Sequence, residues 1–66
     1  MNKYHLVVKY NYSTDWCSRF MVFLNDLHIN GYDVSDEGYI VLSNDDVPLI
    51  EDIANKNHII INIVKL

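Results

Sequence analysis

The single cysteine, Cys17, is the feature that most constrains this 66-residue chain, because it excludes an intramolecular disulfide. A chain of this length buries only about 60% of its unfolded surface, so without a covalent link its stability must come from one small apolar core. Half of the residues are apolar, and there are only two glycines and one proline. We therefore expect a single domain, residues 1–66, made mostly of regular structure with short turns.

Charge divides the chain into an acidic middle and weakly basic ends. The net charge is −4, and all five Lys and Arg residues lie outside the segment 20–55. That segment carries eight acids: Asp26, Asp33, Asp36, Glu37, Asp45, Asp46, Glu51 and Asp52. A nucleic-acid-binding protein normally has a basic patch that displaces counterions from phosphate. We therefore expect no direct binding to nucleic acid or to an anionic membrane. The acids favour either a basic protein partner or solubility alone.

The N-terminal residues Met-Asn-Lys-Tyr-His lack the apolar stretch of a secretory signal. The longest apolar runs, such as 20–24, are far too short to cross a bilayer. A lone free thiol fits a reducing compartment. The sequence thus predicts a soluble, cytoplasmic protein.

The first third of the chain predicts a strand and then a helix. Residues 3–12 alternate with a period of two, which places Tyr4, Leu6, Val8 and Tyr10 inward and His5, Val7 and Lys9 outward. Ser13, Thr14 and Asp15 are N-cap residues, so a helix should run from here to about residue 28, where Asn30 and Gly31 end it. At 100° per residue its apolar arc is about 160° wide. The arc contains Trp16, Cys17, Phe20, Met21, Phe23, Leu24, Leu27 and His28.

The remaining residues predict a hairpin, a second helix and a last strand. Residues 32–35 and 39–43 would be strands joined by the turn 36–38. Asn44 and Asp45 would cap a helix with Pro48 in its first turn and a buried stripe of Leu49, Ile50, Ile53 and Ala54. Residues 58–66 would form the last strand. This order predicts a ferredoxin-like α+β fold, βαββαβ, with a four-stranded antiparallel sheet and two helices on one face.

In that fold the second face of the sheet is open. The alternation assigns to it His5, Val7, Lys9, Tyr39, Val41, Ile60, Asn62 and Val64. A face this rich in aliphatic side chains is typical of an interface, although scattered apolar residues are also normal on protein surfaces.

No pattern in the chain predicts a catalytic, metal or phosphate site. Cys17 lies on the apolar arc of a helix, where a thiol acts as a small hydrophobe. The three histidines are spread over separate elements, and the adjacent carboxylates 36–37, 45–46 and 51–52 point to different faces. Neither glycine begins a helix. We therefore expect no enzyme activity, no cofactor and no metal.

The predicted order of elements resembles that of three ferredoxin-like families, but this chain lacks the defining residues of each. Small copper chaperones carry a second cysteine near the first helix, where this chain has Thr14. The amino-acid-binding ACT domains carry a glycine where this chain has the segment 14–16. RNA recognition motifs stack bases on strand aromatics, but Tyr4 and Tyr10 are predicted inward and the basic, glycine-rich pattern is absent.

Two functions remain as expectations. The first is a small acidic, non-enzymatic protein-binding module. In size and charge it is similar to bacteriophage inhibitors of nucleic-acid-handling host proteins, such as anti-CRISPR and anti-restriction proteins. Its candidate contacts are Asp33, Asp36, Glu37, Asp45, Asp46, Glu51 and Asp52. The alternative is a homodimeric ferredoxin-like regulatory or small-ligand-binding module that pairs through its open sheet face, with Val7, Val41, Ile60 and Val64 at the contact.

Overall fold

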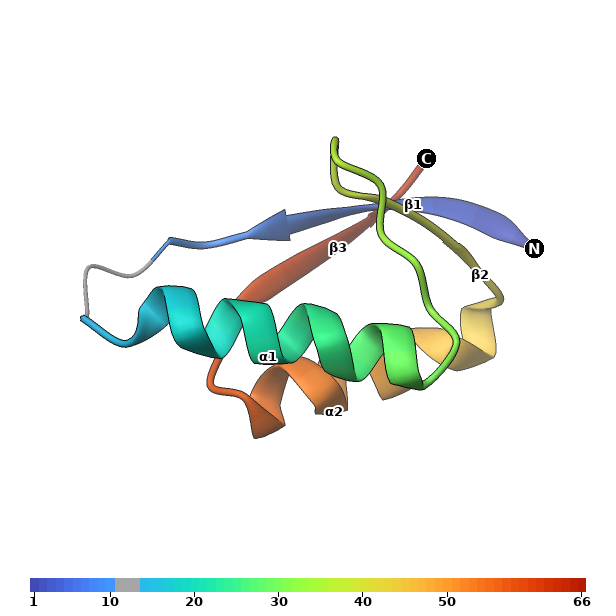
Figure 1. Ribbon diagram of the computed structural model, residues 1–66. Coiled ribbons are helices and arrows are strands. Elements are labelled where there is room, and N and C mark those ends of the chain that lie inside the picture. The colour runs from blue at the N-terminus through green and yellow to red at the C-terminus, as the bar shows by residue number, and fades with distance from the viewer. Residues whose placement is uncertain (11–13) are drawn as a thin grey trace.

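The computed structural model describes residues 1–10 and 14–66 (Figure 1). The element order is strand β1 (Asn2–Val8), helix α1 (Trp16–Ile29), strand β2 (Tyr39–Leu42), the 3₁₀ turn η1 (Asn44–Asp46), helix α2 (Val47–Lys56) and strand β3 (Ile61–Lys65). The end of the predicted first strand, residues 11–12, and the predicted capping by Ser13 lie outside the described residues. Among the described residues, none of the helices has the length and apolar character needed to cross a membrane.

The strands form one antiparallel sheet in the order β2-β1-β3, with β1 in the middle. Both helices lie on the same side of this sheet, so the molecule has two layers (Figure 1). The register pairs Tyr4 with Ile40 on one side of β1, and Leu6 with Ile63 on the other. This register puts the inward residues of all three strands on the helix side, which creates the core.

Nine side chains form the buried core between the two layers: Tyr4, Leu6, Phe23, Leu27, Ile40, Leu42, Ile50, Ala54 and Ile59. Phe23, Leu27 and Ile50 contact no solvent at all. The buried Tyr4 hydroxyl donates a hydrogen bond to the side-chain oxygen of Asn44, which satisfies its polar group at the start of α2. The alternation predicted for β1 is therefore confirmed for Tyr4 and Leu6.

Both helices end in the same hydrogen-bonded motif. At the end of α1, Gly31 has a φ of +87°, its N–H donates to His28 O (3.0 Å), and the Tyr32 N–H donates to Leu27 O (2.8 Å). The predicted stop at Asn30 and Gly31 is confirmed. At the end of α2 the equivalent left-handed residue is His58, with a φ of +57°. The last strand therefore begins three residues later than predicted, because His58 completes the helix end.

The fourth strand is absent, and the ferredoxin-like prediction is wrong on this point: the described residues form a three-stranded βαβαβ arrangement. Residues 32–35 are not a strand. Tyr32 is held at the helix layer, because its N–H donates to Leu27 O and closes the end of α1. Ser35 instead closes a tight turn, accepting from the Gly38 N–H (2.9 Å) and donating to Tyr39 O (2.8 Å). The segment between these two anchors is too short to run beside β2.

Several predicted core residues are exposed, because three strands cover less of each helix than four. On α1, Cys17, Met21 and His28 face solvent, whereas Trp16, Phe20 and Leu24 pack against the core. Leu49 on α2 is half-exposed, although Ile50, Ile53 and Ala54 are covered as predicted.

Tyr10 was expected in the core and is 58% exposed, because β1 ends at Val8. Its ring packs instead against that of Trp16, at 4.8 Å between centroids.

The starts of both helices also differ in detail from the prediction. Asp15 takes the N-cap position of α1 without a side-chain cap bond, and its carboxylate contacts Arg19 at 2.8 Å. Asn44 and Asp45 form a 3₁₀ turn, and α2 begins one turn later with Pro48 in its first turn.

Candidate functional site

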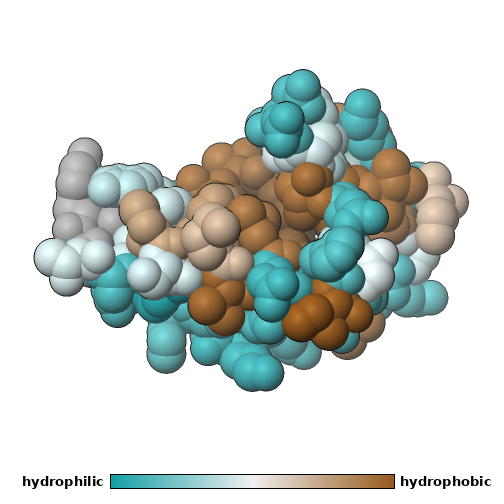
Figure 2. Space-filling view, viewed as in Figure 1, coloured by the Kyte–Doolittle hydropathy of each residue, from teal (hydrophilic) through white to brown (hydrophobic). Residues whose placement is uncertain are grey.

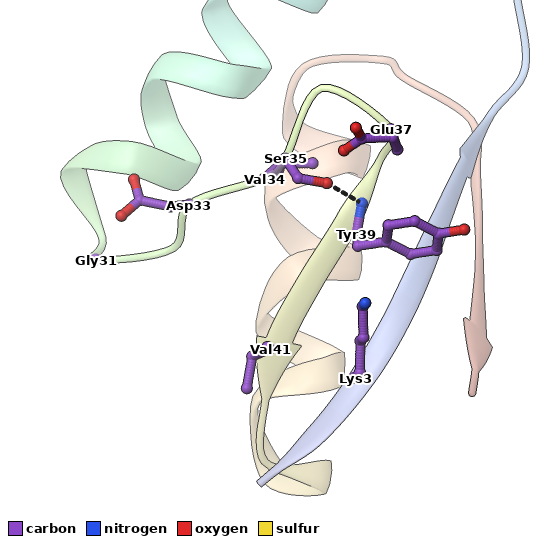
Figure 3. A pocket seen from close by; sticks show the side chains of 8 residues that line it. All are labelled: Lys3, Gly31, Asp33, Val34, Ser35, Glu37, Tyr39 and Val41. Atoms are coloured by element: carbon purple, nitrogen blue, oxygen red, sulfur yellow. Dashed lines mark hydrogen bonds between the residues drawn. The ribbon is translucent and has the colours of Figure 1, made fainter.

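The place left by the absent strand is an open groove of about 580 Å³ along the free edge of β2 (Figure 3). We call it the edge groove. Its lining comes from β1, β2 and the loop that follows α1, and comprises Lys3, Gly31, Asp33, Val34, Ser35, Glu37, Tyr39 and Val41. One wall is the strand edge and the other is the loop (Figure 3).

The pairing pattern of β2 decides which of its peptide groups face the groove. The Leu6 N–H donates to Gly38 O at 2.8 Å, so in the observed register Tyr4 and Ile40 are also a hydrogen-bonded pair. Tyr39 and Val41 then direct their N–H and C=O groups away from β1. Those of Tyr39 are occupied by Ser35, whose Oγ accepts from the Tyr39 N–H (3.0 Å) and whose N–H donates to Tyr39 O (2.8 Å). Within residues 1–10 and 14–66, the groups of Val41 have no hydrogen-bond partner.

The outer face of the sheet, which was predicted to be open, is confirmed as exposed and has two unlike halves. On the β2 side, the Lys3 ammonium lies 4.5 Å from the centre of the Tyr39 ring, and the His5 ring lies 5.0 Å from the same ring. This half is polar and aromatic. On the β3 side, Val7 and Val64 lie on neighbouring strands and are 41% and 42% exposed. Val41 is separated from these two valines by the Lys3–Tyr39 pair.

The predicted acidic contacts do not form one patch. Asp33 and Glu37 line the edge groove, and Asp36 shares the turn with Glu37. Asp45 and Asp46 lie in η1, at the start of α2. The remaining pair, Glu51 and Asp52, lies on the exposed side of α2, and Glu51 borders a separate small pocket with Ile59 and Ile61. The structure thus brings two of the seven predicted residues, Asp33 and Glu37, into the edge groove, whereas Asp36 lines a separate crevice between β1 and α1.

Some carboxylates already have a hydrogen-bond or ion-pair partner within the protein, and we call the others unengaged. Asp33 contacts His28 Nδ1 at 2.9 Å, and Asp46 accepts from Ser43 Oγ at 3.2 Å. Asp26 accepts from Asn57 Nδ2 at 2.9 Å. In the part of the chain that the structure describes, five exposed carboxylates have no ion pair or hydrogen bond: Asp36, Glu37, Asp45, Glu51 and Asp52.

One titratable group is perturbed near the groove. The pKa of Tyr32 is raised above its ordinary value of 10.0, first by loss of solvent and then by the charge and hydrogen bond of Asp46. The influence of Asp46 on this pKa places Tyr32, at the start of the loop, near η1.

A smaller apolar crevice of about 250 Å³ opens on the other side of residues 34–35. It lies between β1 and α1, and Leu6, Val8, Phe20 and Leu24 contribute to its lining. Figure 2 shows a hydrophobic band between the sheet and α1 on this side, below the hydrophilic tip of the loop. The loop thus separates the edge groove, which has three charged side chains in its lining, from a crevice with one, Asp36.

The described residues contain no group of three or more His, Cys, Asp or Glu side chains that could hold a metal ion.

Reasoning from the sequence did not identify Lys3, Ser35 and Val41 as lining one groove, because only the strand register brings them together. The one indication in the sequence was the predicted exposure of Val41 on a short strand.

No protein-family model matches the chain, and no curated protein or solved structure shows significant similarity to it.

Proposed function

We propose that this chain is a small, non-enzymatic protein-binding module that docks on a basic protein. A partner that handles nucleic acid fits best, in the manner of phage-type inhibitors such as anti-CRISPR or anti-restriction proteins. The observation that supports this proposal is the set of five exposed, unengaged carboxylates among the described residues. Fully hydrated charges that satisfy no internal contact contribute little to folding, but they create a negative field. A groove that normally holds phosphates would attract such a surface and accelerate encounter.

The test is charge reversal at Glu51 and Asp52, which are exposed on α2 and distant in sequence from the groove loop. If these acids steer association, the double variant Glu51→Lys, Asp52→Lys should lower the association rate for a partner captured from host lysate about tenfold at low salt. The association rate of the neutral double variant Glu51→Gln, Asp52→Asn should lie between those of the natural chain and the charge-reversed variant. Surface plasmon resonance over a salt series measures both rates. A double reversal that leaves the rate and its salt dependence unchanged would contradict an electrostatic role for α2.

The same series should include Asp36→Lys with Glu37→Lys. Because the acids lie in separate places, the two double variants show which of them faces the partner. Equal losses for both would indicate long-range steering by total charge, whereas a larger loss for one pair would locate the contact.

A second candidate function is a homodimeric regulatory or small-ligand-binding module. It is favoured by Val7, Ile60 and Val64, which are exposed on the outer face of the sheet. A dimer formed there should keep its mass at high salt in sedimentation, and Val64→Lys should weaken it at least about tenfold, because a buried ammonium would lack a partner. Asn55→Lys, at an exposed position on α2 in the other layer, is the control. A monomer at high micromolar concentration in both salt conditions would exclude this function.

A further inference from the structure

We propose that the edge groove binds an extended, basic segment of the partner protein, which adds to β2 as a fourth strand. This inference rests on the proposed function and specifies where the partner contacts the chain. The Val41 N–H and C=O face the groove and are unpartnered within the described residues, and Val41 is 58% exposed. A strand edge of this kind pairs with an added chain through main-chain hydrogen bonds.

The groove also indicates the charge of its occupant. Its lining carries the carboxylates of Glu37, which is unengaged, and Asp33, which contacts His28 Nδ1, against the ammonium of Lys3, which is already held over the Tyr39 ring. Asp36 follows Ser35 in the same turn but lines the crevice on the other side of the loop. The free edge is short, because Ser35 occupies Tyr39 and η1 follows directly after Ser43. Few backbone bonds can form, so lysine or arginine side chains that reach these carboxylates must contribute to binding.

A second copy of this chain fits the edge less well than a basic segment. Two β2 strands paired antiparallel about Val41 would bring the acidic turn 36–37 of each copy toward the acidic η1 of the other, because these two segments flank β2 at its opposite ends. Like charges brought near one another in this way repel. The acids that flank β2 therefore disfavour self-association at this edge, while they remain compatible with a basic chain.

The loop gives the groove a fixed shape. The end of α1 and the Ser35 turn hold residues 31–38 at two points. In Figure 3 the segment that carries Asp33 runs apart from the edge that carries Val41, with the turn of Glu37 closing one end. An added strand would enter a pre-formed site, which reduces the entropy lost on binding.

The test uses the full chain and two synthetic capped peptides of alternating Lys and Val or alternating Glu and Val, followed by ¹⁵N NMR titration. We expect the lysine peptide to bind, with the largest shift at the Val41 amide, and the glutamate peptide not to bind. Val41→Pro removes only an N–H that points away from β1, and proline is tolerated at such edge positions. The Val41→Pro variant should bind the lysine peptide about tenfold more weakly, while the NMR signals of the other amides keep the pattern of the folded chain. A lysine peptide methylated on alternate amide nitrogens should lose binding to a similar extent.

The matched controls are Lys65→Pro, which makes the same change on the outer edge of β3, and the neutral variant at Glu51 and Asp52. Both should bind the lysine peptide as the natural chain does. Unchanged binding by Val41→Pro would overturn strand addition, and it would leave the acidic protein-binding function standing. A chain that captures a basic partner but never binds the lysine peptide would likewise overturn this inference alone. A β2–β2 dimer dissolved by Val41→Pro would overturn it in favour of a second copy.

Discussion

Phe23→Ala should remove a large part of the stability of the chain. Phe23 is 0% exposed and lies at the centre of the only core among the described residues. Truncating a buried phenylalanine to alanine costs about 3–5 kcal/mol of unfolding free energy. The whole stability expected for 66 residues is roughly 3–10 kcal/mol, and no disulfide supports it. Urea unfolding followed by circular dichroism measures the loss.

The control for Phe23→Ala is Val22→Ala, the preceding residue of the same helix, which is 50% exposed. It should change the unfolding free energy by no more than about 0.5 kcal/mol. If Phe23→Ala cost less than about 1 kcal/mol, α1 could not be packed on the sheet as described.

Gly38→Ala should cost more than Gly31→Ala, although both glycines have nearly the same backbone conformation. Their φ values are +89° and +87°, so alanine meets a similar left-handed strain of about 1–2 kcal/mol at each. At Gly31 the added Cβ finds nothing within 4 Å. At Gly38 it lies 3.1 Å from the backbone oxygen of Leu6, which the sheet holds in place. We expect a total loss of about 2–4 kcal/mol for Gly38→Ala.

The two glycine variants separate strain from crowding, because their difference in unfolding free energy reports the contact with Leu6 alone. Equal losses in urea unfolding would show that the turn 35–38 shifts freely away from β1. In the expected case, Gly38→Ala also moves the Ser35 turn that shapes the edge groove, so the binding tests above should use variants outside this turn.

The helices were the most predictable part of the fold. The end of α1 follows from Gly31, which accepts a positive φ, and the position of α2 follows from Pro48, which fits only a first turn. The inward face of β1 was also predictable, because a period of two is a local property of an extended chain. The acidic surface follows from composition alone.

The candidate site was predicted only in part. Asp33, Asp36 and Glu37 were identified as contacts from their charge, but nothing in the sequence separates them from Glu51 and Asp52. The groove that distinguishes them also needs Val41, which lies opposite Lys3 on another strand. Cross-strand register is a long-range property, and a shift by one residue would have placed different side chains there.

The sequence by itself determined where α1 stops, which faces of the elements are apolar and where negative charge accumulates, because these depend on neighbouring residues. Tertiary structure decided whether residues 32–35 became a strand. Their pattern is compatible with one, but the Tyr32 N–H donates to Leu27 O instead, and Ser35 bonds Tyr39 and Gly38. A four-residue segment follows whichever partners satisfy its polar groups, and the position of Leu27 is fixed by its burial in the core. The edge of β2 stays open because residues 32–35 form these hydrogen bonds instead of a strand beside it.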